Sequence, residues 1–278
     1  MVDVLTIEDE EIASWPFEGL LSSQFTMPNH ILWPLPPTRF SLGATDVHVW
    51  AARLALPSGP LVRLASILSQ DESQRAARFR FDTHRDRFIA ARGILRSLLG
   101  TYLHSAADAL QFEYGPNGKP TLTAPFAESG LTFNLAHSED LALFAVTRLG
   151  PIGVDVEQNR PVTDVDELVA RFFSPRETAL FQTLPTSQKN AAFFNLWTRK
   201  EAWLKATGEG IAHSLNLVEV TFLPGEPAQI LGLPETPALK SDWALRELTP
   251  ATGFVGAVAL PDLQFSICNY QFSIPELL

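Results

Sequence analysis

The stretch Gly153-Val154-Asp155-Val156-Glu157, followed roughly forty residues later by Trp197-Thr198-Arg199-Lys200-Glu201-Ala202-Trp203-Leu204-Lys205, carries the most information about this chain. The first segment alternates apolar and acidic residues with the period of a strand, so Asp155 and Glu157 share one face. In the second segment Trp197, Glu201 and Lys205 recur at the spacing of one helical face. Hard cations prefer oxygen ligands, so three carboxylates and a lysine point to a metal–phosphate site.

Each segment also has a simpler interpretation. The strand could present its two carboxylates on a solvated sheet face. Glu201 and Lys205 could form an exposed helical ion pair, which contributes only about 0.3–0.5 kcal/mol. The tryptophans at 197 and 203 weaken the second alternative, because a helix face that holds an indole is usually partly buried.

Composition limits the class of protein. The chain has 278 residues, of which 46% are hydrophobic and 19% charged, so it can build a substantial core of one large or two medium domains. The net charge of −10 argues against a general binder of nucleic acid or of anionic membranes. A local basic pocket is compatible with that charge.

Further features indicate a cytoplasmic protein. Cys268 is the only cysteine, which excludes an intrachain disulfide and a cysteine-based zinc site. The N-terminal residues lack the basic flank and apolar run of a secretory signal. No window is long and apolar enough to predict a membrane span; the segment 141–146 has only the length of a strand.

Apolar periodicity and turn residues outline the elements. The Asn-Gly at 117–118 predicts a turn across 115–120, and Ser174 with Glu177 predicts a capping box that starts a helix. Gly208 predicts the end of the long helix. We expect strands at 46–54, 131–134, 141–147, 152–157, 217–222, 243–248 and 254–260, and amphipathic or helical segments at 71–81, 86–103, 165–173, after 174, and at 189–206.

The order of these elements predicts an α+β fold of two similar subdomains in a pseudo-twofold arrangement, each a small antiparallel sheet packed with helices. Gly150-Pro151 marks the boundary between them. We therefore divide the chain into an irregular strap rich in proline and aromatic residues (1–44), an N-terminal subdomain (45–150) and a C-terminal subdomain (151–278).

The two opening segments resemble the paired signature of the 4′-phosphopantetheinyl transferase superfamily, Gly-(Ile/Val)-Asp-(Ile/Val)-Glu followed by Phe…Trp-(Ser/Thr)-x-Lys-Glu-(Ala/Ser)-x-x-Lys. Upstream segments resemble the two-domain, Sfp-like members rather than the short trimeric synthases. These are the helix from Asp86-Arg87, the turn Gly115 to Pro120, and Phe133-Asn134-Leu135-Ala136-His137-Ser138. The likeness covers roughly residues 45 to 260.

The resemblance implies an enzyme that transfers the 4′-phosphopantetheine arm of coenzyme A to a serine hydroxyl of an apo acyl or peptidyl carrier protein and releases 3′,5′-ADP. Asp155, Glu157 and Glu201 would hold Mg²⁺, with Asp155 counted among the catalytic residues. Glu201 would also be the base, and Lys205 would neutralise pyrophosphate charge. The resemblance further implies a monomer with its site between the subdomains.

Coenzyme A contacts carry over by position to Arg87, Lys119, His137 and, through a less similar segment, Arg75. Taken singly, Arg87, Lys119 and His137 could be a surface residue, a turn lysine and a core histidine. Ala136 departs from the family, which often has a serine there that contacts a phosphate. The loss of such a hydrogen bond costs about 1.5–3 kcal/mol, so we expect weaker coenzyme A binding.

Two other functions fit the residues less well. A different Mg²⁺-dependent phosphoryl transferase or hydrolase lacks support, because the chain has no P-loop motif. A non-catalytic carrier-protein or coenzyme A binding module would have no need of intact Asp155, Glu201 and Lys205. The sequence does not distinguish carriers of fatty acid, polyketide or nonribosomal peptide synthesis.

Overall fold

A computed structural model of the chain describes residues 31–37, 40–209, 215–216, 218–232 and 243–273. Most of the predicted N-terminal strap therefore lies outside the described residues. Its described part contacts the second half of the chain: Ile31 forms an isolated bridge with Ala251, and the Leu32 amide donates to the carbonyl of Pro250 at 2.8 Å.

The first sheet has the strand order β11-β1-β5-β4, with β1 at Asp46–Arg53, β4 at Thr132–Ser138, β5 at Leu141–Thr147 and β11 at Ser266–Gln271. The pairs β1–β5 and β5–β4 are antiparallel, as expected. The pair β1–β11 is parallel, because the last strand crosses back from the second half of the chain. The boundary at residue 150 thus separates the two sheets except for β11.

Three helices cover the outer face of this sheet: α2 (Ser58–Ala65), α3 (Gln70–Ala76) and α4 (Asp82–Leu103). Alternate residues of β1, such as Trp50 and Ala52, pack with Ile94 and Leu98 of α4 in one apolar cluster. A hairpin of β2 (Phe112–Tyr114) and β3 (Pro120–Leu122) follows α4, and the turn predicted at 115–120 connects its strands. Short 3₁₀ helices lie at Ala107–Ala109 and Phe126–Ser129.

The second sheet is antiparallel with the order β6-β10-β9, formed by Gly153–Gln158, Phe254–Pro261 and Trp243–Leu248. Three helices pack on its outer face or beside it: α5 (Val165–Phe172), α6 (Pro175–Gln182) and α7 (Thr186–Thr207). A two-stranded sheet of β7 (Glu219–Val220) and β8 (Ile230–Gly232) lies next to them.

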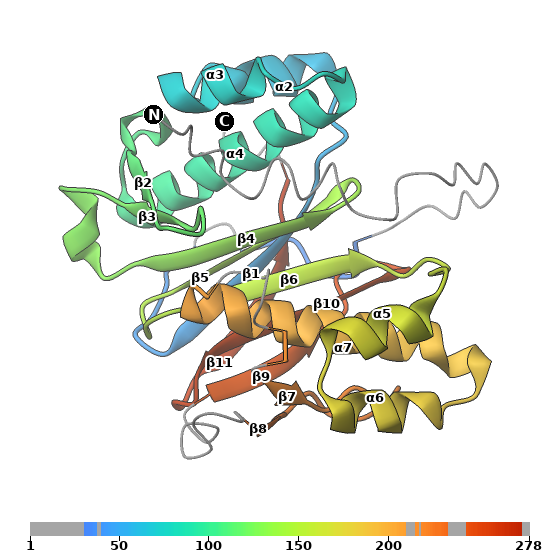
Figure 1. Ribbon diagram of the computed structural model, residues 1–278. Coiled ribbons are helices and arrows are strands. Elements are labelled where there is room, and N and C mark those ends of the chain that lie inside the picture. The colour runs from blue at the N-terminus through green and yellow to red at the C-terminus, as the bar shows by residue number, and fades with distance from the viewer. Residues whose placement is uncertain (1–30, 38–39, 210–214, 217, 233–242, 274–278) are drawn as a thin grey trace.

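Figure 1 shows α2, α3 and α4 above the first sheet, and α5, α6 and α7 beside the second sheet in the lower half of the molecule. A third apolar cluster lies between the sheets and joins residues of β1 and β5, such as Val49 and Leu143, to residues of β6 and β10, such as Val154 and Val258. The α+β class is confirmed. Each half places a helix of 22 residues, α4 or α7, against the outer face of its sheet.

The helix signals read from the sequence are present. Ser174 accepts a hydrogen bond from the amide of Glu177, and the Glu177 carboxylate reaches back to the Ser174 amide, so both arms of the capping box form. Gly208 ends α7 in the left-handed conformation at φ 80°. Of the helices that the structure describes, none is long and apolar enough to cross a membrane.

Candidate active site

The candidate site is built on an unusually close contact between β6 and α7. Gly153 faces α7, and a Cβ atom on Gly153 would lie 2.1 Å from the carbonyl oxygen of Ala202 and 2.3 Å from the amide nitrogen of Ala206. Only glycine permits backbone to approach backbone at this distance. The contact sets the face of β6 that carries Asp155 directly against the last turns of α7.

Asp155 and Lys205 meet across this contact. The Lys205 Nζ donates to Asp155 Oδ1 at 2.7 Å, and Asp155 is 4% exposed. Burial lowers the pKa of Lys205, but the charges of Asp155, Glu201 and Glu157 more than offset it, so the net pKa is raised and the ammonium stays charged. Asp155 Oδ2 is buried and has no hydrogen-bond partner in the described part of the chain.

Glu157 lies on the same face of β6, two residues further on, and is half-buried. Its Oε2 accepts a hydrogen bond from the Ser138 hydroxyl at 2.7 Å. Burial raises the pKa of Glu157 to about 8, and the neighbouring charge of Asp155 adds to the rise. Two carboxylates this close to each other favour a bound cation, which would relieve their repulsion.

Glu201 lies one helical turn before Lys205 on α7 and is 2% exposed. It is near enough to Lys205 to raise the pKa of that lysine. Trp197 and Trp203 are both buried, as the helix pattern indicated. The structure thus brings together Asp155, Glu157, Glu201 and Lys205, the four residues expected to perform the chemistry.

The carboxylates suit a hard divalent cation in their chemistry, and the buried Asp155 Oδ2 offers it a ligand atom. Within the described ranges, however, no group of three or more His, Cys, Asp or Glu side chains is arranged to hold a metal ion. Mg²⁺ usually takes only one or two carboxylates and completes its octahedron with phosphate oxygens and water. The pair Asp155 and Glu157 therefore fits Mg²⁺ in the presence of a phosphate substrate.

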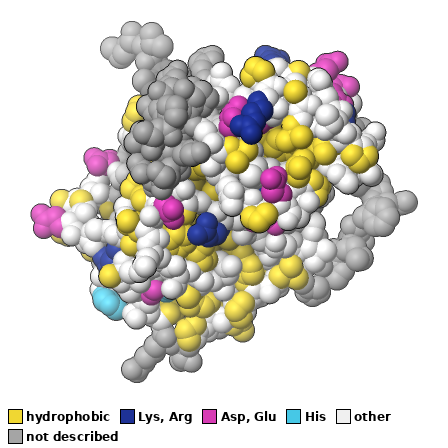
Figure 2. All heavy atoms as spheres, turned by 90° about the horizontal axis from the view of Figure 1, so that it is seen from below, with side chains coloured by type: hydrophobic (Ala, Val, Ile, Leu, Met, Phe, Trp, Pro, Cys, Tyr) yellow, Lys and Arg dark blue, Asp and Glu magenta, His cyan; other side chains and the backbone are white. Residues whose placement is uncertain are grey.

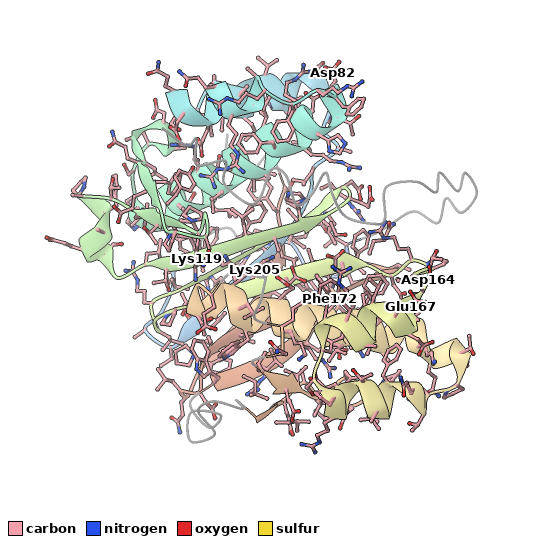
Figure 3. The ribbon with its side chains drawn as sticks, in the orientation of Figure 1. Asp82, Lys119, Asp164, Glu167, Phe172 and Lys205 are labelled. Atoms are coloured by element: carbon pink, nitrogen blue, oxygen red, sulfur yellow. The ribbon has the colours of Figure 1, made fainter. Side chains whose placement is uncertain are left out.

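Lys119 is placed differently from the expected phosphate contact. Its Nζ donates to three backbone carbonyls, those of Ile152 at 3.0 Å, Lys205 at 2.6 Å and Ala206 at 3.3 Å. An ammonium group has three protons, so these carbonyls account for all of them. Figure 3 shows Lys119 and Lys205 meeting where the upper and lower halves join.

Basic side chains gather beside this junction. The His137 ring lies at the end of β4, where desolvation and the nearby charges of Lys205, Arg87 and His84 lower its pKa to about 4, so the imidazole is neutral at physiological pH. The Arg87 guanidinium contacts the Glu139 carboxylate at 3.3 Å, and its Nε is buried without a hydrogen-bond partner among the described residues. Lys205 and Arg87 thus form a local basic cluster in a chain of net charge −10, and the neutral His137 ring beside them can donate one N–H to an anion.

The other two predicted coenzyme A contacts lie on α3 and on β4. The Arg75 guanidinium stacks over the ring of Phe88 at 5.3 Å from its centroid. Ala136 is 4% exposed and packs in the apolar cluster between the sheets. The structure therefore places the methyl group of Ala136 in the core, where a serine hydroxyl would need a partner.

Sequence reasoning missed two polar residues that support the site. Asn134 Oδ1 accepts from the Val154 amide at 2.8 Å, and Ser138 Oγ accepts from the Gln158 amide at 3.2 Å while donating to Glu157. Their side chains join β4 to β6, which belong to different sheets. The period of two in 132–138 puts both on one face, and this was the available signal.

Comparison with known proteins places these features in a family. The family model of the 4′-phosphopantetheinyl transferase superfamily matches residues 151–259, and that of the 4′-phosphopantetheinyl transferase N-terminal domain matches residues 58–148. The 4′-phosphopantetheinyl transferase HetI of Nostoc sp. is 47% identical over 84% of this chain and 95% of its own. The transferase psf-1 of Bacillus pumilus is 32% identical over 55% of this chain and 64% of its own.

A solved structure of Helicobacter pylori holo-[acyl-carrier-protein] synthase in complex with coenzyme A aligns with 40% of this chain and 99% of its own. Its identity is 22% and its TM-score 0.28, so we base nothing on that likeness. The family models and the relatives by sequence are sufficient: the chain belongs to the 4′-phosphopantetheinyl transferase superfamily and is a transferase.

Proposed function

We propose that this enzyme transfers the 4′-phosphopantetheine arm of coenzyme A to a serine hydroxyl of an apo carrier protein, in a Mg²⁺-dependent reaction that releases 3′,5′-ADP. The observation that carries the proposal is the Lys205–Asp155 pair at 2.7 Å, with Glu157 and Glu201 beside it. Phosphoryl transfer depends mainly on positioning and on neutralising charge, which such a group of residues can supply.

Asp155 and Glu157 would hold the metal, and Glu201 would contribute a further oxygen or a water-mediated contact. When bound, Mg²⁺ supplies positive charge to the oxygens of the pyrophosphate. Lys205 carries a second positive charge on the same face, because its carboxylate neighbours keep it protonated. Its ammonium would contact the pyrophosphate and stabilise the leaving 3′,5′-ADP.

Glu201 would be the general base. As the serine Oγ attacks the phosphorus that bears the pantetheine arm, its proton passes to Glu201 directly or through a water, and the bond from that phosphorus to the bridging oxygen breaks. The electron pair leaves with 3′,5′-ADP. Glu201 is buried one turn from Lys205, so both would act on the same reacting group.

The basic cluster would bind the phosphates of coenzyme A. The guanidinium of Arg87 suits a phosphate clasp, since its contact with Glu139 is long at 3.3 Å and its buried Nε has a proton to donate. The exposed ring of His137 adjoins it. Arg75 would contribute only after leaving the Phe88 ring, so it is the weaker candidate.

We further propose a monomer that acts in the cytoplasm on acyl or peptidyl carriers of fatty acid, polyketide or nonribosomal peptide synthesis. Figure 2 shows hydrophobic side chains spread among isolated acidic and basic ones on the lower face of the molecule. With a net charge of −10, long-range attraction would not bring an acidic carrier to this enzyme. Docking would therefore use local apolar or basic contacts.

The test is intact-mass spectrometry of an apo acyl carrier and an apo peptidyl carrier, each incubated with the protein, coenzyme A and Mg²⁺. The expected result is a mass gain of one phosphopantetheine that EDTA abolishes, and the relative rates then identify the preferred carrier. A gain that persists in EDTA would refute the metal assignment. No gain on either carrier, with coenzyme A binding retained, would refute the proposed reaction for these carriers.

A further inference from the structure

The turn between β2 and β3, in the N-terminal half, forms hydrogen bonds with the C-terminal end of α7, the helix that carries Lys205. Lys119 and Asn117 lie in the turn between β2 and β3. Lys119 Nζ donates to the carbonyls of Lys205 and Ala206, and Asn117 Nδ2 donates to the carbonyl of Gly208 at 2.8 Å. The two side chains therefore bind the C-terminal end of α7 from the other half of the molecule. Figure 3 shows Lys119 beside Lys205 at this place.

These contacts satisfy backbone carbonyls that the helix itself leaves unpaired. The last four carbonyls of a helix have no partner within it and carry partial negative charge, which favours a cation. At the end of α7 the Gly208 amide satisfies Leu204, and Lys119 satisfies Lys205 and Ala206. Residues of the same turn thus complete the cap that glycine begins.

The third contact of Lys119 gives this cap a link to the site. Its Nζ also donates to the carbonyl of Ile152, directly before β6 and three residues before Asp155. A single ammonium group therefore fixes the backbone of Lys205 to the backbone that leads to Asp155. The side chains of those two residues form the 2.7 Å pair of the site.

We propose that Lys119 is a positioning residue that holds Lys205 in register with Asp155, rather than a ligand of coenzyme A phosphate. The inference rests on the proposed function for its catalytic consequence, but its structural part stands on the contacts alone. A misplacement of about 1 Å at a reacting group can lower the rate on the order of a hundredfold. Loss of Lys119 should therefore reduce turnover while leaving coenzyme A binding intact.

The experiment compares Lys119→Met, which keeps the aliphatic stem and removes all three donors, with Lys119→Arg, which keeps the charge and the donors. Lys189→Met is the matched control, because Lys189 lies near the other end of α7 and pairs with Asp166. For each variant we would measure kcat and the KM for coenzyme A by intact mass, coenzyme A binding by calorimetry, and amide hydrogen exchange of the segments 150–156 and 203–209.

Lys119→Met should lower kcat by at least about tenfold, leave the coenzyme A KM and Kd within about twofold, and speed exchange in both segments. Lys119→Arg should recover part of kcat, and Lys189→Met should change none of these values. A raised coenzyme A Kd with unchanged kcat would overturn the proposal in favour of a phosphate contact. Unchanged kcat and exchange would overturn it outright.

A lower melting temperature with kcat unchanged below it would show a merely structural role and would also overturn the proposal. If the wild-type protein transfers nothing to any carrier, the proposed function fails while the hydrogen-exchange result still decides whether Lys119 orders the end of α7. The two failures are therefore distinguishable.

Discussion

Asp155 uses its two carboxylate oxygens differently. Lys205 occupies Oδ1, whereas Oδ2 is buried with no hydrogen-bond partner in the described part of the chain. A buried acceptor left in this state costs about 1–3 kcal/mol, so its retention is better explained by function than by stability. Asparagine has the same shape as aspartate, but its amide is neutral. It would neither attract a cation nor form a charge-assisted hydrogen bond with Lys205.

We therefore expect Asp155→Asn to lower the transfer rate by about a hundredfold or more, with the fold retained. The intact-mass assay measures the rate, and circular dichroism checks the fold. Asp82→Asn is the matched control, because Asp82 begins α4 in the outer helical layer and forms an exposed pair with Arg85 (Figure 3). Transfer at the wild-type rate by Asp155→Asn would remove this residue from the mechanism.

The raised pKa of Glu157 should make the stability of the metal-free protein depend on pH. Its pKa is raised from 4.5 to about 8, so the folded protein keeps a proton that the unfolded chain loses. Stability contributed by this group is complete below pH 4.5, falls as the pH rises toward 8, and is constant above that. The Mg²⁺ proposed to bind Glu157 would compete with this proton, so it should stabilise the protein more at pH 8 than at pH 6.

Urea unfolding in EDTA between pH 5 and 8, repeated with Glu157→Gln, isolates this contribution. The free energy of unfolding of the wild-type protein should fall with rising pH more steeply than that of Glu157→Gln. The difference between the two free energies should therefore change across this pH range. Parallel profiles for the two proteins would show that the pKa of Glu157 is not raised.

At the scale of elements, the contact between β6 and α7 decides where the site forms. Replacing Gly153 with alanine would put a Cβ atom 2.1 Å from the Ala202 carbonyl and 2.3 Å from the Ala206 amide, both backbone atoms of α7. We expect the helix to shift away from β6, with a loss of about 1–3 kcal/mol or more in the free energy of unfolding. Because the shift separates Lys205 from Asp155, the transfer rate should fall as well.

Gly59→Ala in α2 is the control for this substitution. Its added Cβ would meet only the end of the Arg63 side chain at 3.9 Å, and alanine favours a helix over glycine by about 1 kcal/mol. Urea unfolding should show it neutral or stabilising, with unchanged transfer. If Gly153→Ala behaved like Gly59→Ala, the close contact would not determine the site.

Several elements could be predicted because their signals are local. The strand 141–147 and the strand 243–248 were placed at their observed bounds, and the capping box at Ser174 forms as expected. The helix α2 was missed, since it has no side-chain cap at its N-terminus and only Leu64 is buried. The strand β11 was missed because its partner β1 lies more than two hundred residues earlier, and period alone does not identify a distant partner.

At the scale of the whole molecule, groupings of residues within one element could be predicted from local patterns, whereas contacts between distant segments could not. The grouping of Asp155 with Glu157, and of Glu201 with Lys205, follows from the periods of one strand and one helix. The contacts of Lys119 with three carbonyls, and of Ser138 with Glu157, depend on how two halves of the chain meet. No local pattern encodes that meeting, so the sequence places Lys119 only in a turn and does not indicate that Ser138 contacts Glu157.

How the halves meet also predicts how the molecule unfolds. Leu143 of the first sheet and Val258 of the second are both fully buried in the cluster between the sheets, and β11 returns to the first sheet from the second half. Neither half can unfold without exposing apolar surface of the other, so we expect one cooperative transition by calorimetry. Leu143→Ala should lower the free energy of unfolding for that transition by about 2–5 kcal/mol. Val258→Ala should lower the free energy of unfolding for the same transition by a smaller amount.

Val62→Ala on α2 serves as the control, because Val62 is 68% exposed and its truncation should leave the transition nearly unchanged. Two separable transitions, each sensitive to only one of the core variants, would show that the sheets fold independently. In that case the site at their junction would form only when the two halves dock. A single transition instead means that the core which folds the protein also holds Lys119 against α7, because the same packing of the two halves maintains both.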